Sequence, residues 1–161
     1  MRLLLTTSFL IVLLGCGARY GENWRQVSEA GLTVMMPGEP VKTKAGTTTT
    51  FQVSAGRELF VVTYDLGAAR PDDAEQALDY FRNGFVLSLP NSTLVGEKPV
   101  TSGDARGREL TVDVPGRGQQ VTVRAFAAKG IVYSAGVSRP KGAQLSDDAR
   151  KFLDSVAIQT R

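Results

Sequence analysis

The residue types that most often do chemistry in proteins are scarce in this chain. It contains no histidine and one cysteine, Cys16. Nucleophilic catalysis by a Ser-His-Asp or Cys-His arrangement is therefore excluded, as are zinc sites built from histidine and cysteine. Carboxylate pairs remain at Asp72-Asp73 and Asp147-Asp148, and such pairs can do acid–base work or bind a cation. Both pairs stand at expected helix starts, where capping accounts for them without catalysis.

Arginines form the second group of candidate site residues. Arg106, Arg108 and Arg124 are expected on neighbouring strands, and Arg106 and Arg108 share a side because residues two apart in a strand point the same way. A cluster of guanidinium groups there is a candidate site for an anionic group of a partner. The alternative is that these arginines pair with nearby acidic residues, for which the candidates are Asp104, Glu109 and Asp113.

The position of Cys16 carries more information than its thiol chemistry. It follows one positive charge at Arg2 and an apolar stretch over residues 3–14, an order typical of a secretory signal. That stretch is too short for a bilayer-spanning helix, which needs about 20 residues. Leu13-Leu14-Gly15-Cys16 resembles the bacterial lipobox, in which the cysteine receives a diacylglyceryl thioether and becomes the first mature residue. An ordinary cleaved signal with an incidental cysteine is the alternative.

The lipobox resemblance divides the chain into three segments. Residues 1–15 are expected to be a lipoprotein signal peptide, residues 16–23 a lipidated tether and residues 24–161 a single globular domain. Fully extended, the tether reaches only about 25 Å, so the domain should lie close to a membrane. We therefore expect a lipid-anchored, extracytoplasmic protein of the bacterial cell envelope, facing the periplasm. Gly17 stands where a membrane-retention aspartate could stand, which favours the outer membrane over the inner in a host with two membranes.

Composition limits the classes of partner. Hydrophobic residues make up 42% and charged residues 22% of the chain, as in ordinary folded proteins. The formal net charge of +3 is small and no basic run is present, so we expect no nucleic-acid partner. No Gly-rich phosphate-binding spacing precedes a helix, and we expect no cofactor.

Most of the chain consists of short β-branched and aromatic segments bounded by turn residues. The expected strands cover residues 24–27, 32–36, 47–54, 58–66, 93–100, 105–114, 119–128 and 131–138. Residues 72–89 and 147–156 instead have helical spacing. In the first of these, Asp72 is the expected N-cap, Phe81 and Phe85 are expected to lie against the sheet, and Gly84 is expected to allow close packing there.

Consecutive hairpins predict a largely antiparallel sheet. The segment 58–66 is apolar on both sides of the strand, with Leu59 and Val61 on one side and Phe60 and Val62 on the other. Both faces of the sheet are therefore expected to be covered, with a helix on each side. The predicted fold class is α+β, a three-layer α/β/α sandwich.

This order of elements resembles the Mog1/PsbP-like fold, and in particular the small uncharacterised bacterial lipoproteins of that group. The resemblance is carried by Leu-Thr-Val-Met-Met-Pro-Gly-Glu-Pro at 32–40, Gly-Arg-Glu-Leu at 107–110, Ile-Val-Tyr at 131–133 and Phe-Leu-Asp-Ser-Val at 152–156. Members include an extrinsic photosystem subunit, a nuclear-transport accessory factor and envelope lipoproteins. The resemblance implies a shared fold and the binding of other proteins, and it offers no catalytic motif to carry over.

Together these features favour a non-enzymatic accessory protein, anchored through Cys16, that binds a protein or envelope component through a sheet edge or the hairpin tips. Two alternatives stay open. One is a carrier of a small apolar ligand in a cleft between sheet and helix, and the other is a weak hydrolase that uses carboxylates. An apolar cleft would favour the carrier, whereas an exposed apolar patch would favour partner binding.

Overall fold

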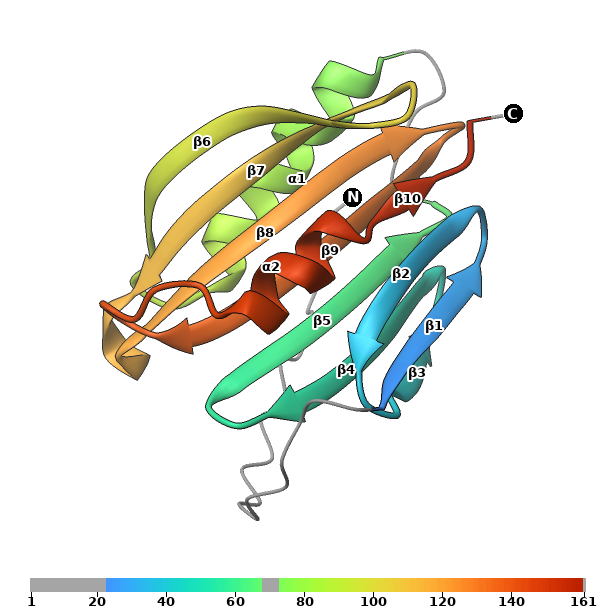
Figure 1. Cartoon of the computed structure of the whole chain (residues 1–161). Coiled ribbons are helices and arrows are strands. Elements are labelled where there is room, and N and C mark those ends of the chain that lie inside the picture. Colours follow the sequence, from blue (N-terminus) through green and yellow to red (C-terminus); the bar gives the residue numbers. More distant parts are fainter. Residues whose placement is uncertain (1–22, 68–72, 161) are drawn as a thin grey trace.

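The computed structural model of the protein describes residues 23–67 and 73–160, which form two sheets and two α-helices (Figure 1). The strands are β1 (Trp24–Glu29), β2 (Leu32–Pro37), β3 (Val41–Ala45), β4 (Thr48–Ala55), β5 (Glu58–Asp65), β6 (Thr93–Ser102), β7 (Ala105–Val114), β8 (Gln119–Ala128), β9 (Ile131–Pro140) and β10 (Ala157–Ile158). The helices are α1 (Ala74–Ser88) and α2 (Asp147–Asp154), with a short 3-10 turn η1 (Pro115–Arg117).

Both sheets are antiparallel. The larger has seven strands in the order β3-β4-β5-β9-β8-β7-β6, and the smaller has the order β1-β2-β10. Tight turns explain this topology, since the Lys129-Gly130 turn between β8 and β9 has positive φ at both residues, the geometry that suits a two-residue hairpin. The predicted α+β class with a largely antiparallel sheet is confirmed.

The two helices cover opposite faces of the large sheet (Figure 1). On one face α1 packs against β7, β8 and part of β9, with Leu78 buried and Phe81 and Phe85 half-buried against the sheet. On the other face α2 and the small sheet together enclose the main core, where Phe152 meets Phe60 edge to face with ring centroids 5.3 Å apart. Each helix has one apolar side that it buries against the sheet, and this gives the three layers.

The described residues cover the large sheet only partly on the α1 side. Side chains of β5 alternate between a buried set that includes Phe60 and Val62 and a half-buried set that includes Leu59 and Val61. The second set lies on the α1 side, and α1 packs over β7 to β9 rather than over β5. Within residues 23–67 and 73–160, the predicted helix cover over this side of the segment is therefore missing. An apolar period of two residues fixes where a side chain points, not which element covers it.

Several boundaries differ from the sequence-based expectation. Strand β3 and the two-residue strand β10 were not predicted, because the first has no buried residue and the second is too short to have a pattern. Helix α1 is capped by Asp73, whose Oδ1 accepts from the backbone N–H groups of Glu75 at 3.0 Å and Gln76 at 3.1 Å. Asp72, the predicted cap, lies outside the described residues.

Candidate functional site

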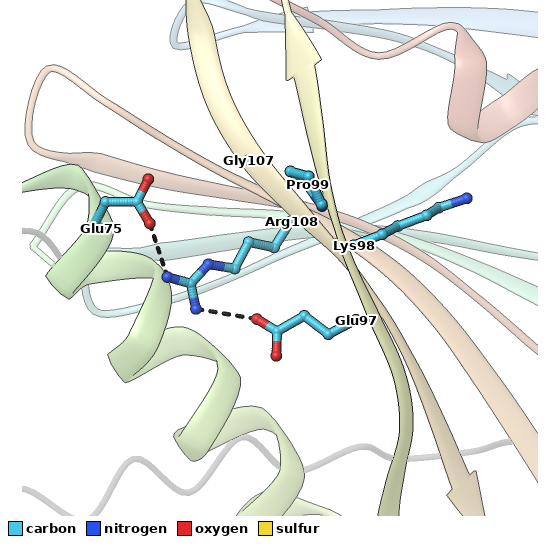
Figure 2. Close-up of a pocket in the computed structure, with 6 residues that line it drawn as sticks. All are labelled: Glu75, Glu97, Lys98, Pro99, Gly107 and Arg108. Atoms are coloured by element: carbon cyan, nitrogen blue, oxygen red, sulfur yellow. Dashed lines mark hydrogen bonds and ion pairs between the residues drawn. The ribbon is translucent and has the colours of Figure 1, made fainter.

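Arg108 on β7 is the centre of a charged cluster that joins α1 to the edge of the large sheet. Its guanidinium donates to Glu75 at 2.8 Å and Asp79 at 2.6 Å from α1, and to Glu97 on β6 at 3.1 Å (Figure 2 shows Glu75 and Glu97). The hydrogen bonds that its guanidinium donates to these carboxylates raise the pKa of Arg108, and the bond to Asp79 lowers the pKa of that carboxyl group. Both terminal nitrogens of Arg108 are thus engaged within the molecule.

Arg124 on β8 belongs to a second charged row, on the opposite face of the sheet. It donates to Glu109 on β7 at 2.7 Å, to Asp154 of α2 at 2.8 Å and to the carbonyl oxygen of Leu153 at 2.8 Å. Lys98 on β6 extends the row, with its Nζ 2.9 Å from Glu109 Oε1. Burial alone would raise the pKa of Glu109, but hydrogen bonds from Arg124 and Lys98 outweigh it and the pKa lies below its ordinary value.

The structure therefore separates the three arginines. Arg124 stands directly opposite Glu109 in the β7–β8 register, so it shares the α2 side of the sheet, whereas Arg108 stands opposite Ala125 on the α1 side. Arg106 shares the α1 side with Arg108, two residues away on β7, and is exposed to solvent. The three side chains do not form one cluster. Anion binding by any of them stays a prediction.

Of the acidic partners proposed from sequence, only Glu109 bonds one of these arginines. Asp113 pairs instead with Lys141 at 2.9 Å, and its pKa is lowered first by that hydrogen bond and then by one from Gln120. Asp104 has Thr160 at 3.5 Å as a weak hydrogen-bond partner. The ion-pair partners of Arg108 on α1 were not predicted because they lie in another element, far from Arg108 in the sequence. Cys16, the predicted lipidation site, lies outside the described residues.

Two hollows stand out among the described residues, and charged residues line both. The first, of about 170 Å³, lies beside Arg108 between α1 and β6 and is lined by Glu75, Glu97, Lys98, Pro99, Gly107 and Arg108 (Figure 2). The second, of about 460 Å³, lies between β1 and β3 and its lining includes Arg25, Glu29, Glu39 and Lys42. Neither is the apolar cleft between sheet and helix that the carrier interpretation requires.

The carboxylate pairs act at helix starts where they are described. Asp73 caps α1, and the side chain of Asp147 is fully exposed and pairs with Arg150 at 2.8 Å within α2. The sequence predicts Ser146 as the cap of α2, and this is confirmed by the hydrogen bond that its Oγ accepts from Ala149 N. In residues 23–67 and 73–160 no three acidic, histidine or cysteine side chains come together in a way that could hold a metal ion.

The outward side of α1 carries an apolar stripe that the sequence reasoning missed. Tyr80 and Leu87 are 69% and 85% exposed and lie seven residues apart, on the same side of the helix. Gly84 lies between them, and a Cβ added there would meet nothing within 4 Å. The expectation that Gly84 allows close packing on the sheet is therefore wrong. We call Tyr80, Gly84 and Leu87 the α1 outer stripe; its signal in the sequence is a pair of large apolar residues that do not fit the spacing of the inner face.

Below pH 8.5, stability should depend on pH mainly in the acid range. The pKa values of Glu29, Asp79, Glu109 and Asp113 all lie below their ordinary values in the folded protein. Their contribution to folding stability is thus complete above about pH 4, where these groups titrate in the unfolded chain. It is lost as the pH falls through their lower pKa values in the folded protein. Between pH 6 and pH 8.5 the chain has no histidine, and the thiol of Cys16 is expected to be lipidated. Only a free α-amino group is then left to contribute a small slope.

Denaturant midpoints at pH 3.5, 6, 7 and 8.5 check this expectation. The midpoint should fall at pH 3.5 and be flat from pH 6 upward, and the Glu109→Gln variant should show a smaller fall on acidification. A change in unfolding free energy above about 1 kcal/mol between pH 6 and pH 8.5 would contradict it and would indicate a strongly perturbed ionisable group.

Comparison with known proteins shows similarity in fold. No known protein family and no curated protein matches the sequence. Among solved structures, cyanobacterial PsbP (CyanoP) from Synechocystis is similar with a TM-score of 0.64 at 10% identity, over 91% of this chain and 99% of that one. A protein of unknown function from Pseudomonas aeruginosa has a TM-score of 0.43 at 15% identity, over 73% of this chain and 83% of that one. A Bacteroides thetaiotaomicron protein has a TM-score of 0.41 at 11% identity, over 81% of this chain and 46% of that one.

The likeness to CyanoP covers nearly the whole of both chains, and the chain therefore has a PsbP-like fold. This confirms the fold expected from the order of elements. Within the described part of the chain, neither helix has the length and apolar character needed to cross a bilayer.

Proposed function

We propose that the protein is a lipid-anchored, extracytoplasmic accessory protein without catalytic activity that binds a partner protein of the bacterial envelope. The lipobox-like run ending at Cys16 supports the anchor. The PsbP-like fold is consistent with an accessory role by analogy, because the members of this group named above bind other proteins. The engagement of Arg108 and Arg124 in internal ion pairs is consistent with a structural role for these groups.

The observation that carries the proposal is the α1 outer stripe. A glycine inside a helix costs about 1 kcal/mol relative to alanine, and no internal contact of Gly84 compensates for that cost. Tyr80 and Leu87 expose large apolar surfaces on either side of it. A small residue between two large apolar ones lets a partner approach the helix backbone closely while both side chains are buried. The α1 outer stripe thus replaces the sheet edge or hairpin tips as the proposed site of contact.

Replacing Gly84 by alanine should separate binding from folding. We expect Gly84→Ala to raise the free energy of unfolding by about 0.5–1 kcal/mol, because Ala is the better helix former and its methyl group points into open space. The same variant should lose the heterologous adducts formed with a lysine-reactive crosslinker in intact cells. The control is Gln76→Ala, another exposed α1 position, which should retain them. Unchanged adducts in a more stable Gly84→Ala protein would remove this stripe from the proposal.

The anchor has its own test. We expect Cys16→Ala to move the protein from the membrane fraction to an uncleaved or soluble form, because the thioether to the lipid cannot form. Mass spectrometry of the mature protein should find a diacylglyceryl group on Cys16. An unmodified mature N-terminus would contradict the lipid anchor. It would not affect the proposal that the α1 outer stripe binds a partner, which the Gly84→Ala variant tests.

A further inference from the structure

The large sheet leaves part of its α1 side without cover from any described residue. This region spans β3, β4, β5 and the part of β9 that α1 does not contact. The strand registers align its side chains in rows that run across the strands. Two of these rows are Val41–Gln52–Val61–Gly136 and Thr43–Thr50–Thr63–Ser134. All of these residues are exposed or half-buried. We call these two rows, with Leu59 beside them, the β3–β5–β9 face.

The residues of the β3–β5–β9 face carry no charge, and the next row on the same side of the sheet carries Asp65 on β5. Its nine residues are valine, leucine, threonine, serine, glutamine and glycine. The opposite side of the sheet carries instead the charged row through Glu109 and Arg124, and the outer end of β7 carries Arg106. Hydroxyls on the face are partly paired with each other, as between Thr50 and Thr63, whose Oγ1 atoms are 3.4 Å apart. A flat surface of β-branched and small side chains without charge is suited to packing against another sheet face.

We propose that the β3–β5–β9 face binds the same face of a second copy of this chain, forming a two-fold symmetric dimer. A two-fold interface places each residue against its own surface patch, so a charged patch would repel itself, whereas this one does not. Nothing on the face offers the opposite charge that a strongly charged partner would need. The surface is also too rich in hydroxyl and amide groups to be suited to lipid.

The layer spacings allow this arrangement. Facing sheets pack about 10 Å apart, and a helix is about 10 Å thick. Helix α1 rises from the same side of the sheet beside the β3–β5–β9 face (Figure 1). In a face-to-face dimer each α1 would therefore lie beyond the β3 edge of the other copy. Strand β3 is the outer strand of the large sheet, and its five residues are all exposed.

The extent of the face predicts a weak dimer. Four strands spaced about 4.8 Å apart, over about six residues rising about 3.3 Å each, give an outline of roughly 400 Å². Standard stable interfaces bury about 800 Å² per partner, so the isolated protein should dimerise only at high concentration. Confinement to a membrane would raise the local concentration and favour the dimer. The dimer uses a surface separate from the α1 outer stripe and goes beyond the proposed function.

Thiol crosslinking of the full chain in its own membrane tests this directly. A cysteine introduced by Val61→Cys should give a covalent dimer with a bifunctional maleimide, whereas Gln26→Cys, on the exposed strand β1, should not. The parent chain measures any reaction of Cys16 itself. In a Thr63→Cys background, adding Val61→Lys should lower the dimer yield to the control level, while adding Gln26→Lys, with the same charge change, should leave it unchanged.

Each outcome decides for or against the dimer. Equal yields from Val61→Cys and Gln26→Cys, or no dimer from either, would overturn it, and so would an adduct of Val61→Cys with a different protein alone. Sedimentation of the purified Val61→Lys and Gln26→Lys proteins from low micromolar to millimolar concentration gives the second readout. Association should persist with Gln26→Lys and disappear with Val61→Lys, and matching thermal unfolding of the two variants would show that Val61→Lys is folded. If no dimer forms but the crosslinks to other proteins that depend on Gly84 are still found, the dimer proposal fails and the proposed function stands.

Discussion

Replacing Phe152 by alanine should lower the free energy of unfolding by about 3–5 kcal/mol. Phe152 is fully buried on α2, and its ring meets Phe60 of β5 edge to face. It therefore joins α2 to the large sheet, within a core that also receives the small sheet. The loss combines the transfer of a large aromatic side chain with the cavity that its removal leaves, since neighbouring strands cannot collapse into it.

Equilibrium denaturation of Phe152→Ala measures this loss, and Leu87→Ala is the control. Leu87 is also a large apolar residue on a helix, but it is 85% exposed, so its removal should change stability by less than about 0.5 kcal/mol. Similar losses for the two variants would contradict the assignment of the core. A loss under 1 kcal/mol for Phe152→Ala would mean that α2 does not close the main core in solution.

The second large effect is expected at a glycine of β7, between β6 and β8. A Cβ at Gly107 on β7 would lie 2.4 Å from the carbonyl oxygen of Ala125 and 2.5 Å from Cδ1 of Phe126, both on β8. The ring of Phe126 thus occupies the space where a side chain would stand, and the backbone contact cannot be relieved by a rotamer change. We expect Gly107→Ala to destabilise the protein by about 1–3 kcal/mol, because β7 and β8 must move apart or Phe126 must leave its place.

A matched substitution on the next strand isolates this cause. A Cβ at Gly96 on β6 would lie 3.6 Å from the Cβ of Thr111, an ordinary contact, so Gly96→Ala should be tolerated. Denaturant midpoints of the two variants give the comparison. If Gly107→Ala is as stable as Gly96→Ala, the packing of Phe126 over β7 is not as described.

Local chemistry made much of the fold predictable. The Lys129-Gly130 hairpin needs positive φ at two adjacent residues, and Gly130 makes part of that requirement visible in the sequence. The apolar stripe of α1 likewise predicted that Phe81 and Phe85 face the sheet, as they do. Strand β3 was missed because Val-Lys-Thr-Lys-Ala at an exposed sheet edge has no buried side to create a pattern.

The candidate site could be predicted far less well, because it depends on which elements meet. Arg108 pairs with residues of α1 that lie about 30 positions earlier in the chain, and no spacing rule connects them. The sequence also showed that Leu59 and Val61 form an apolar side of β5. It did not show that no described element covers that side. Gly84 was noticed as unusual in a helix, but whether it faced the sheet or solvent depended on the rotation of α1 about its axis.

Photo-crosslinking from α1 in intact cells tests the central claim most directly. A photoreactive amino acid at position 87, in place of the exposed Leu87, should form an adduct with a different protein, and Gly84→Ala should remove that adduct. The same photoreactive residue at position 26, on exposed β1, is the control and should not form it. No adduct from position 87, or one that also forms from position 26 and persists in Gly84→Ala, would contradict the account of this protein as a partner-binding accessory protein.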